Sequence, residues 1–193
     1  MYTVVGLGNP GNEHENTRHN TGRMAVLAFL KKNECAELET DKKRRALKSE
    51  CKIGKPHSTK ASQGKNKILC LLPETYMNKS GNSVVGLKPK DVILLHDDLD
   101  LPLGTFKISF GRGSGGHKGV ESVMRALKSK DFIRIRIGIT PAKKPEAKKI
   151  NDFILKKFPP KEMESLKKVF KKTSEALEMI IIDDLQKAMN QFN

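Results

Sequence analysis

Short apolar runs alternate with amphipathic helical patterns along the chain, and this alternation predicts an α/β fold. The runs that we expect to form strands span residues 3–7, 49–53, 67–72, 92–96, 105–110 and 132–139. Helical spacing of apolar residues covers 22–32 and 118–127. A chain of 193 residues fits one domain, or at most two small ones, and no linker composition divides it.

Two regions depart from this alternation. We expect a variable loop region over 42–65, whose second half is rich in Gly, Pro, Ser and Lys. From Pro160 onward, apolar residues recur at helical spacing with many lysines opposite them. This pattern predicts a basic C-terminal helical region over 160–193.

The charge balance of the chain indicates a polyanionic partner. Its 37 basic residues outnumber the 22 acidic ones and give a formal net charge of +15. Nucleic acid fits such a surplus better than an anionic membrane does. The alternative is a lysine-rich surface that only keeps the protein in solution. No apolar run has the length of a membrane span, and no signal peptide is visible, so we expect a soluble protein.

Cysteine usage favours a reducing compartment. Cys35, Cys51 and Cys70 are odd in number and never spaced as C-x-x-C. Neither a disulfide framework nor a zinc knuckle is therefore expected, and the cytoplasm is the predicted location.

The stretch that follows the first expected strand has the spacing of a dinucleotide-binding loop, Gly6-x-Gly8-x-x-Gly11. Its context does not fit that use, because Pro10 interrupts it and the apolar helical pattern begins only near Gly22. Proline pushes the preceding residue to an extended backbone. We therefore expect Pro10 to hold Asn9 at the carboxyl end of the strand, with its amide presented as donor and acceptor.

Three further polar stretches are expected at strand exits: "PETYMNKSG" (73–81), "HDDLDLPLG" (96–104) and "GRGSGGHKG" (111–119). The first contains Met77 and Asn78, with Ser80 as a possible helix cap, and the third offers backbone N–H groups to an anion. Each could be an ordinary turn, an acidic loop or a capped helix. Because α/β sheets bind ligands at the carboxyl ends of their strands, we expect these stretches and the Asn9 loop to share one site.

These motifs, "GLGNPG", "TRHNTG", "PETYMNKSG", "HDDLDLPLG" and "GSGGHKG" in this order, resemble the bacterial-type peptidyl-tRNA hydrolases over about residues 4–140. The resemblance implies one domain over 1–193, with a mixed, twisted β-sheet flanked by helices. It implies a cytoplasmic monomer that cleaves the ester between a peptide and the 3′-terminal ribose of tRNA, with peptidyl-tRNA as its partner. It also implies that no metal or organic cofactor is needed.

The resemblance assigns roles to individual residues. His19 corresponds to the general base, Asp97 to its carboxylate partner and Asn9 to the asparagine of the first loop. The residues expected to contact substrate are Met77, Asn78, His117, Lys118 and His14. The residues expected to bind a tRNA phosphate are Arg136, Lys107 and Arg112.

The length of the segment 42–65 departs from the family pattern, and so do three single positions. Lys118 stands where the family usually has asparagine, and His14 stands near the place of a frequent tyrosine. Ser109 occupies the position of a lysine that can help to bind the tRNA terminal phosphate. Lys107 and Arg112 are close to this position in the sequence and could take the place of that lysine.

Other classes of function compete with this interpretation. A metal hydrolase could use His96, Asp97, Asp98 and Asp100, but alternate residues of a strand point to opposite faces. A serine esterase could use Ser80 or Ser114, yet the chain has no G-x-S-x-G elbow. A non-catalytic RNA-binding protein is the strongest rival, although pure binding does not need a base with a carboxylate partner.

Overall fold

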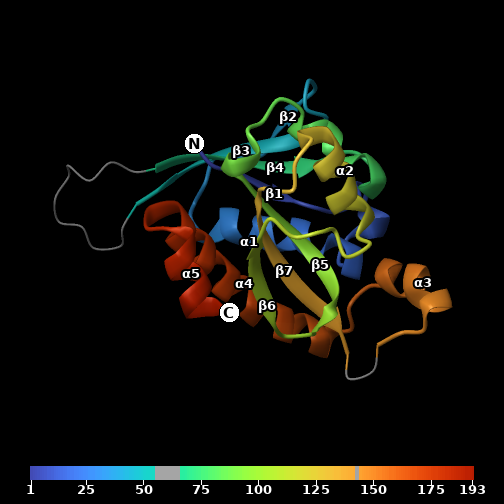
Figure 1. Ribbon diagram of the computed structural model, residues 1–193. Helices are drawn as coiled ribbons and strands as arrows, with labels where there is room; N and C mark the ends of the chain where they lie inside the picture. Colours follow the sequence, from blue (N-terminus) through green and yellow to red (C-terminus); the bar gives the residue numbers. More distant parts are fainter. Residues whose placement is uncertain (55–65, 142–143) are drawn as a thin grey trace.

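The computed structural model describes residues 1–54, 66–141 and 144–193, and Figure 1 shows a central twisted sheet with helices on both sides. The strands are β1 (Thr3–Gly6), β2 (Glu39–Asp41), β3 (Ala46–Ile53), β4 (Asn66–Pro73), β5 (Val92–Pro102), β6 (Phe106–Phe110) and β7 (Ile133–Thr140). The α-helices are α1 (Thr21–Lys32), α2 (Lys118–Leu127), α3 (Ile150–Leu155), α4 (Pro160–Ile182) and α5 (Leu185–Phe192). Short 3₁₀ helices are η1 (Asn12–His14), η2 (Arg18–Asn20), η3 (Met77–Val84), η4 (Pro89–Asp91) and η5 (Ala147–Lys149).

The strands form one mixed sheet in the order β2-β3-β4-β1-β5-β7-β6. The central strands β4, β1, β5 and β7 are parallel, whereas β2, β3 and β6 pair antiparallel at the two edges. This confirms the expected fold class of a mixed sheet flanked by helices. The carboxyl ends of the parallel strands consequently meet at one edge of the sheet, where α/β proteins bind ligands.

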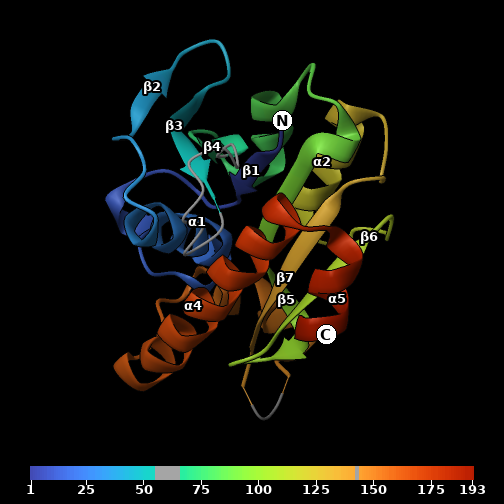
Figure 2. The ribbon, with the colours of Figure 1, turned by 90° about the vertical axis from the view of Figure 1, so that its left-hand side faces the viewer.

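Each central strand is buried on both faces. Val4 of β1 packs in a core beneath α1, α4 and α5, while Val5 packs in a second core beneath α2 and η3. This continuous burial is typical of parallel strands covered by helices on both sides. Figure 2 shows α4 and α5 side by side on the face that also carries α1.

Several elements differ from the sequence-based expectation. The strand expected over 92–96 continues to Pro102, so the acidic motif lies largely on β5 rather than after it. Strand β2 and helix α3 were not expected, and both are short. Ser80 does not begin a helix; its hydroxyl donates to the carbonyl of Met77 inside η3.

The region expected to be a variable loop, 42–65, is only partly accounted for by the structure. Residues Ala46–Ile53 form β3, which begins three residues earlier than the predicted strand and pairs along its length with β4. Residues 55–65 lie outside the described part of the chain. The basic region from Pro160 is helical, as expected, and comprises α4 and α5.

The expectation that the chain has no disulfide is wrong, because Cys35 and Cys51 are bonded. The segment that follows α1 runs beside β3, where the amide of Ala36 donates to the carbonyl of Glu50 and Ser49 Oγ donates to Ala36. This pairing brings the two Cα atoms to 4.8 Å, a normal disulfide separation that sequence spacing does not reveal. Cys70 is free, and burial raises the pKa of its thiol to about 12.

No helix within the described residues has both the length and the hydrophobicity needed to span a membrane.

Candidate active site

Close packing of α1 on the sheet positions the first site residue. A side chain on Gly22 would overlap the carbonyl group of Leu95 on β5, and one on Gly6 would come within 2.7 Å of the Gly22 carbonyl oxygen. Glycine at these two positions therefore lets the start of α1 lie directly against β1 and β5. The 3₁₀ turn that precedes α1 carries His19, which is thereby placed beside Asp97 of β5.

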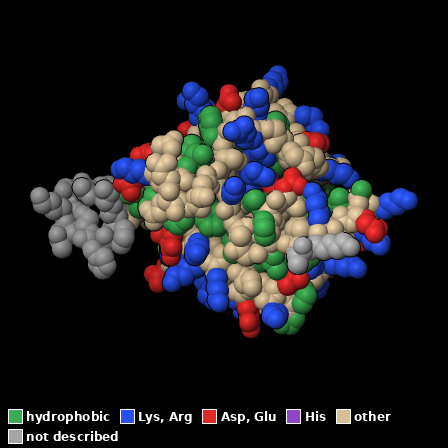
Figure 3. Space-filling model, turned by 60° about the horizontal axis from the view of Figure 1, so that its bottom comes forward, with side chains coloured by type: hydrophobic (Ala, Val, Ile, Leu, Met, Phe, Trp, Pro, Cys, Tyr) green, Lys and Arg blue, Asp and Glu red, His purple; other side chains and the backbone are tan. Residues whose placement is uncertain are grey.

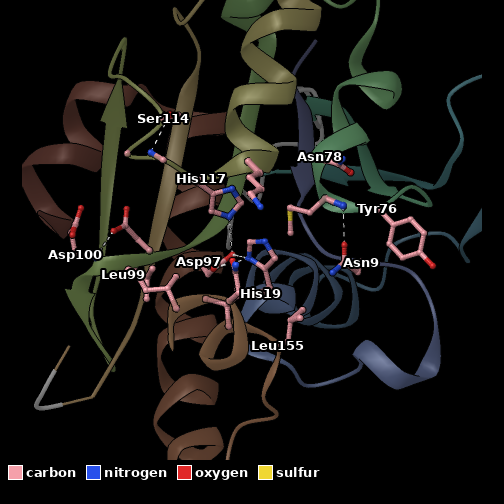
Figure 4. A pocket seen from close by; sticks show the side chains of 18 residues that line it. Asn9, His19, Tyr76, Asn78, Asp97, Leu99, Asp100, Ser114, His117 and Leu155 are labelled. Carbon is pink, nitrogen blue, oxygen red and sulfur yellow. Dashed lines mark hydrogen bonds and ion pairs between the residues drawn. The ribbon is translucent and has the colours of Figure 1, made fainter. Parts of the chain in front are cut away.

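His19 and Asp97 form a buried hydrogen-bonded pair. Nδ1 of His19 lies 2.9 Å from Oδ2 and 3.1 Å from Oδ1 of Asp97 (Figure 4). Because an ionised carboxylate can only accept, Nδ1 carries the proton of the neutral ring. Nε2 then keeps a lone pair, and His19 lines a cavity of about 530 Å³. This is the arrangement that a general base requires.

His117 binds the same carboxylate from the opposite side of the site. Its Nε2 lies 2.9 Å from Oδ1 of Asp97, and its Nδ1 accepts from the amides of Gly119 and Val120 at the start of α2. His117 is thus the N-cap of α2, and the cap interaction fixes the ring proton on Nε2. Asp97 consequently accepts hydrogen bonds from two histidines.

Opposing effects set the protonation states of Asp97 and His19. Burial alone would raise the pKa of Asp97, but the charges and hydrogen bonds of His19 and His117 outweigh it and hold that pKa below its ordinary value. Burial of His19 lowers its pKa, yet Asp97 raises it by more, so the net pKa of His19 is raised. The positive charge of Lys118 opposes this rise. Asp97 is therefore ionised, and it stabilises the imidazolium that forms when His19 accepts a proton.

His96 lies beneath this pair and is completely buried. Its Nδ1 donates to the backbone carbonyl of Asp97 at 2.7 Å, and its ring packs edge-on against His117 with centroids 4.8 Å apart. Nε2 has no hydrogen-bond partner in the described structure. Burial, followed by the neighbouring His117 and Arg134, lowers the pKa of His96 well below its ordinary value. His96 is therefore neutral and supports the backbone that presents Asp97.

The donor set of His19, Asp97 and His117 suits proton transfer better than metal binding. Their potential ligand atoms lie within 4.8 Å of one another. Nε2 of His117, however, carries a proton as long as Nδ1 caps α2, so a metal ion would have to displace that proton. The carboxylates of the rival metal interpretation have other partners: Asp98 binds Arg136, and Asp100 binds Lys144.

Asn9 is held rigidly. Its backbone N–H and C=O are bound by the side chain of Asn20, and its Oδ1 accepts from the amide of Met77 at 2.8 Å. The side-chain oxygen thus already accepts one hydrogen bond, which leaves one of its two lone pairs for a ligand. Nδ2 remains as the donor that can face a ligand. Asn20, which the sequence reasoning missed, fixes this loop.

The cavity brings together most of the residues that the sequence singled out. Asn9, His19, Met77, Asn78, Asp97, His117 and Lys118 all line it. His14 does not line the cavity. Its ring lies edge-on to the ring of Tyr76, with the two centroids 6.4 Å apart, and Tyr76 lines the cavity. The sequence reasoning missed the apolar side of the cavity, which consists of Tyr76, Leu99, Ile150, Ile154 and Leu155.

A second cavity of about 540 Å³ shares a wall with the first, since Asp98, Ser114 and Gly115 line both. Its basic lining residues are Lys107, Arg112, Arg134 and Arg136. We call it the basic cavity. Arg134 and Arg136 are two positions apart on β7 and so face the same side of the strand. Arg136 Nε donates to Oδ2 of Asp98 at 2.6 Å, while Arg134 donates to the carbonyl of Gly113.

One face of the molecule is rich in basic side chains. Figure 3 shows Lys and Arg side chains spread widely over the lower face of the molecule, with fewer Asp and Glu side chains between them. This agrees with the net charge of +15 and with a polyanionic ligand.

The whole chain is similar to proteins of one family. The peptidyl-tRNA hydrolase family model matches residues 3–193. The peptidyl-tRNA hydrolase of Alkaliphilus oremlandii is 35% identical over 200 residues, with both chains fully covered. That of Carboxydothermus hydrogenoformans is 36% identical over 199 residues, covering 100% of this chain and 98% of its own.

Solved structures agree with these sequence relationships. A peptidyl-tRNA hydrolase in complex with N-propanol has a TM-score of 0.86 and 30% identity, covering 100% of this chain and 94% of its own. The enzyme from Acinetobacter baumannii has the same TM-score and coverage at 29% identity. The family model spans nearly the entire chain and the relatives match it from end to end, so this chain belongs to the peptidyl-tRNA hydrolase family, a family of hydrolases.

Proposed function

We propose that this chain hydrolyses the ester that joins a peptide to the 3′-terminal ribose of tRNA, and so recycles tRNA during translation. The observation that carries the proposal is the pair of His19 and Asp97 in a cavity that adjoins a second, basic cavity. A base with a carboxylate partner serves hydrolysis, and the adjoining cationic groups suit the phosphates of a nucleic acid.

The proposed reaction begins with a water molecule beside His19. Nε2 removes a proton from this water as its oxygen attacks the ester carbonyl carbon. Asp97 holds the ring in the correct tautomer and stabilises the imidazolium. When the tetrahedral intermediate collapses, the ribose oxygen leaves and takes the proton from Nε2. The peptide is released as a carboxylic acid, and the base is neutral again.

The amides near His19 complete the proposed catalytic site. Nδ2 of Asn9 is the catalytic donor to the developing oxyanion or to a peptide carbonyl, because its Oδ1 is already bound to Met77. Asn78, His117 and Lys118 bind the peptide portion, with Met77 beneath them. His14 acts on the substrate through its contact with Tyr76. Side chains of this chain supply the base, the carboxylate and the donors, so the reaction needs neither metal nor cofactor.

The basic cavity is the proposed binding site for a tRNA phosphate, through Arg136, Lys107 and Arg112. Arg134 supports this role, since it lies on the same face of β7 as Arg136. Lys107 and Arg112 are exposed, so their positive charges lie at the rim of the basic cavity. Asp98 neutralises part of the charge of Arg136, so a phosphate oxygen competes with this carboxylate for the guanidinium.

We also propose that the protein acts as a cytoplasmic monomer without an obligate protein partner. The resemblance to the bacterial-type peptidyl-tRNA hydrolases supports a monomer. The location follows from the substrate, since translation takes place in the cytoplasm. The disulfide between Cys35 and Cys51 removes the separate argument for this location that rested on cysteine usage.

The direct test is to incubate the purified protein with peptidyl-tRNA that carries a labelled peptide and to measure free peptide with and without EDTA. We expect EDTA-insensitive cleavage, and a loss of about two to four orders of magnitude in turnover for His19→Ala with little change in tRNA binding. Binding without cleavage would favour the rival, a non-catalytic RNA-binding protein. Retention of most of the rate by His19→Ala would overturn the assignment of the base.

A further inference from the structure

Arg18 immediately precedes His19 and has an unusually large set of interactions for a buried arginine. Nη2 donates to Oε2 of Glu162 at 2.6 Å. Nη1 donates to the backbone carbonyls of Lys157 at 3.0 Å and Lys156 at 3.4 Å. The side chain is only 7% exposed. A buried guanidinium paired in this way holds its neighbours in one geometry, because its fork of donors is rigid.

Two aromatic rings contact the same guanidinium. Cζ of Arg18 lies 4.5 Å from the ring centroid of Phe153 and 4.8 Å from that of Phe158. These are cation–π distances. Arg18 therefore joins the turn that carries His19 to α3 through Phe153, to the α3–α4 connection through Phe158, and to the start of α4 through Glu162.

Helix α3 contacts this arginine and also lines the cavity. Phe153 contacts Arg18, whereas Ile150, Ile154 and Leu155 of the same helix line the cavity. Leu99 of β5 adds to these apolar groups. In Figure 4, Leu99 and Leu155 lie below His19 and Asp97, and His117 lies above them. We call the four residues Leu99, Ile150, Ile154 and Leu155 the apolar wall.

The apolar wall differs chemically from the rest of the cavity. Asn9, Asn78 and Lys118 offer polar groups to a peptide backbone, while the wall offers none from its side chains. Leu155 is 48% exposed, so it would lose contact with water on binding an apolar group. The side chain of the residue esterified to tRNA is attached to the atom next to the attacked carbonyl carbon, and must therefore lie close to His19.

We propose that Arg18 is a positioning residue that fixes the apolar wall, and that this wall gives the enzyme a preference for substrates whose esterified residue is large and apolar. The proposal rests on the proposed function and adds the class of substrate. Backbone bonds between Arg18 and Lys156 and between Phe158 and Asn16 hold the segment after α3. Arg18 adds the contact to the body of α3 itself, through Phe153.

The test compares two peptidyl-tRNAs that differ only in the esterified residue, leucine in one and glycine in the other. The ratio of their kcat/KM values is independent of the fraction of enzyme that is correctly folded. We expect the wild-type protein to favour leucine, and Arg18→Met to lower the leucine-to-glycine ratio about fivefold to twentyfold. Arg18→Lys keeps the charge but not the planar fork, and should recover only part of this loss.

Three further variants make the experiment decisive. Glu162→Gln removes one charge while the guanidinium remains, and should lower the ratio less than Arg18→Met does. It also keeps the proposal testable if Arg18→Met does not fold. Phe153→Leu removes the ring contact and should change the ratio in the same direction. Lys32→Gln is the matched control, because it breaks the ion pair with Glu178 that joins α1 to α4 away from both cavities.

The outcomes separate this proposal from the proposed function. A wild-type enzyme that cleaves both substrates equally well would overturn the preference for an apolar residue. A ratio that stays at the wild-type value in Arg18→Met and Glu162→Gln would overturn the positioning role. Absence of cleavage of either substrate by the wild type would instead overturn the proposed function.

Discussion

His117 and Asp97 are joined by a hydrogen bond of 2.9 Å between Nε2 and Oδ1, on the carboxylate that also orients His19. Because His117 caps α2 through its other ring nitrogen, one side chain connects the start of a helix to the carboxylate of Asp97. A change at His117 should therefore affect both the stability of α2 and the basicity of His19, and suitable variants can separate the two effects.

We predict that His117→Ala shifts the acid limb of the kcat/KM profile to higher pH. Without this donor, more of the negative charge of Asp97 acts on His19, which favours the imidazolium and raises the pKa of the base. The base must be neutral to act, so activity appears only at higher pH. The lost cap should also destabilise the protein by about 1 kcal/mol, measured by urea unfolding.

The control for this prediction is His117→Asn, since asparagine caps helices well but is shorter than histidine. It should restore the stability and leave the acid limb displaced. If the asparagine variant restored both, the hydrogen bond to Asp97 would have no separate effect on His19.

A second prediction concerns stability at acid pH and uses His96. Its pKa is lowered in the folded state, so the unfolded chain binds a proton below about pH 6.5 that the folded protein does not. Stability from this group is present above that pH and is lost as the pH falls. Between pH 7 and pH 5, the wild type should lose about 2 kcal/mol more unfolding free energy than His96→Phe.

The titration of His19 and Asp97, which lie near His96, does not produce this difference. The pKa of His19 is raised, so its contribution is fully present below pH 6.5 and is lost only as pH rises through its folded-state value. The pKa of Asp97 is lowered, so its contribution is lost only in more acidic solution than this experiment uses. Parallel pH curves for the wild type and His96→Phe in urea unfolding would contradict the prediction.

A third prediction tests the basic cavity through the salt dependence of tRNA affinity. Three to five phosphate contacts would give a slope of log affinity against log salt of roughly −2 to −4. Arg136→Ala should make this slope shallower by about one unit. Arg44, which donates to the carbonyls of Ser83 and Val85 and lines neither cavity, supplies the matched control variant Arg44→Ala.

Asp98→Asn gives an independent check on the same cavity. It releases Arg136 from its ion pair, so affinity for tRNA should increase at low salt. If the slope is unchanged in Arg136→Ala and the affinity is unchanged in Asp98→Asn, the tRNA phosphate does not bind at β7.

The sequence predicted the elements whose signals are local. Apolar periodicity over eight or more residues identified α1, α2 and the C-terminal helices, and the apolar runs identified the central strands. The motif residues His19, Asp97, Asn9 and His117 were predicted to share a site, and the structure brings them together. Their roles in catalysis stay predictions.

The parts that could not be predicted depend on tertiary contacts. Helix α3 has six residues, and it packs through Arg18 and Phe153, which no local pattern indicates. The disulfide forms because β3 places Cys51 beside Cys35. The hydrogen bond to the side-chain oxygen of Asn9 comes from the amide of Met77, which is far away in the sequence. The apolar wall likewise combines β5 with α3, far apart in sequence.

The last prediction concerns Lys118, the residue that departs most clearly from the family pattern. Lys118 lines the cavity with His19, and its charge lowers the pKa of that base, in opposition to Asp97. Lys118→Asn removes this charge, so the imidazolium forms more easily and the pKa of His19 rises. The acid limb of kcat/KM should therefore move to higher pH, measured with the labelled peptidyl-tRNA at constant ionic strength. Because lysine has no acceptor, the asparagine also regains an acceptor for water or peptide, which should appear in KM.

The alternative is that the exposed ammonium of Lys118 binds a tRNA phosphate instead of acting on His19. Salt dependence distinguishes the two roles, since loss of a phosphate contact makes the slope of affinity against salt shallower by about one unit. Lys128→Asn is the matched control, because Lys128 lies at the other end of α2 and lines neither cavity. A displaced acid limb with an unchanged slope supports the action on His19. An unmoved limb with a shallower slope eliminates it and assigns Lys118 to the phosphate backbone.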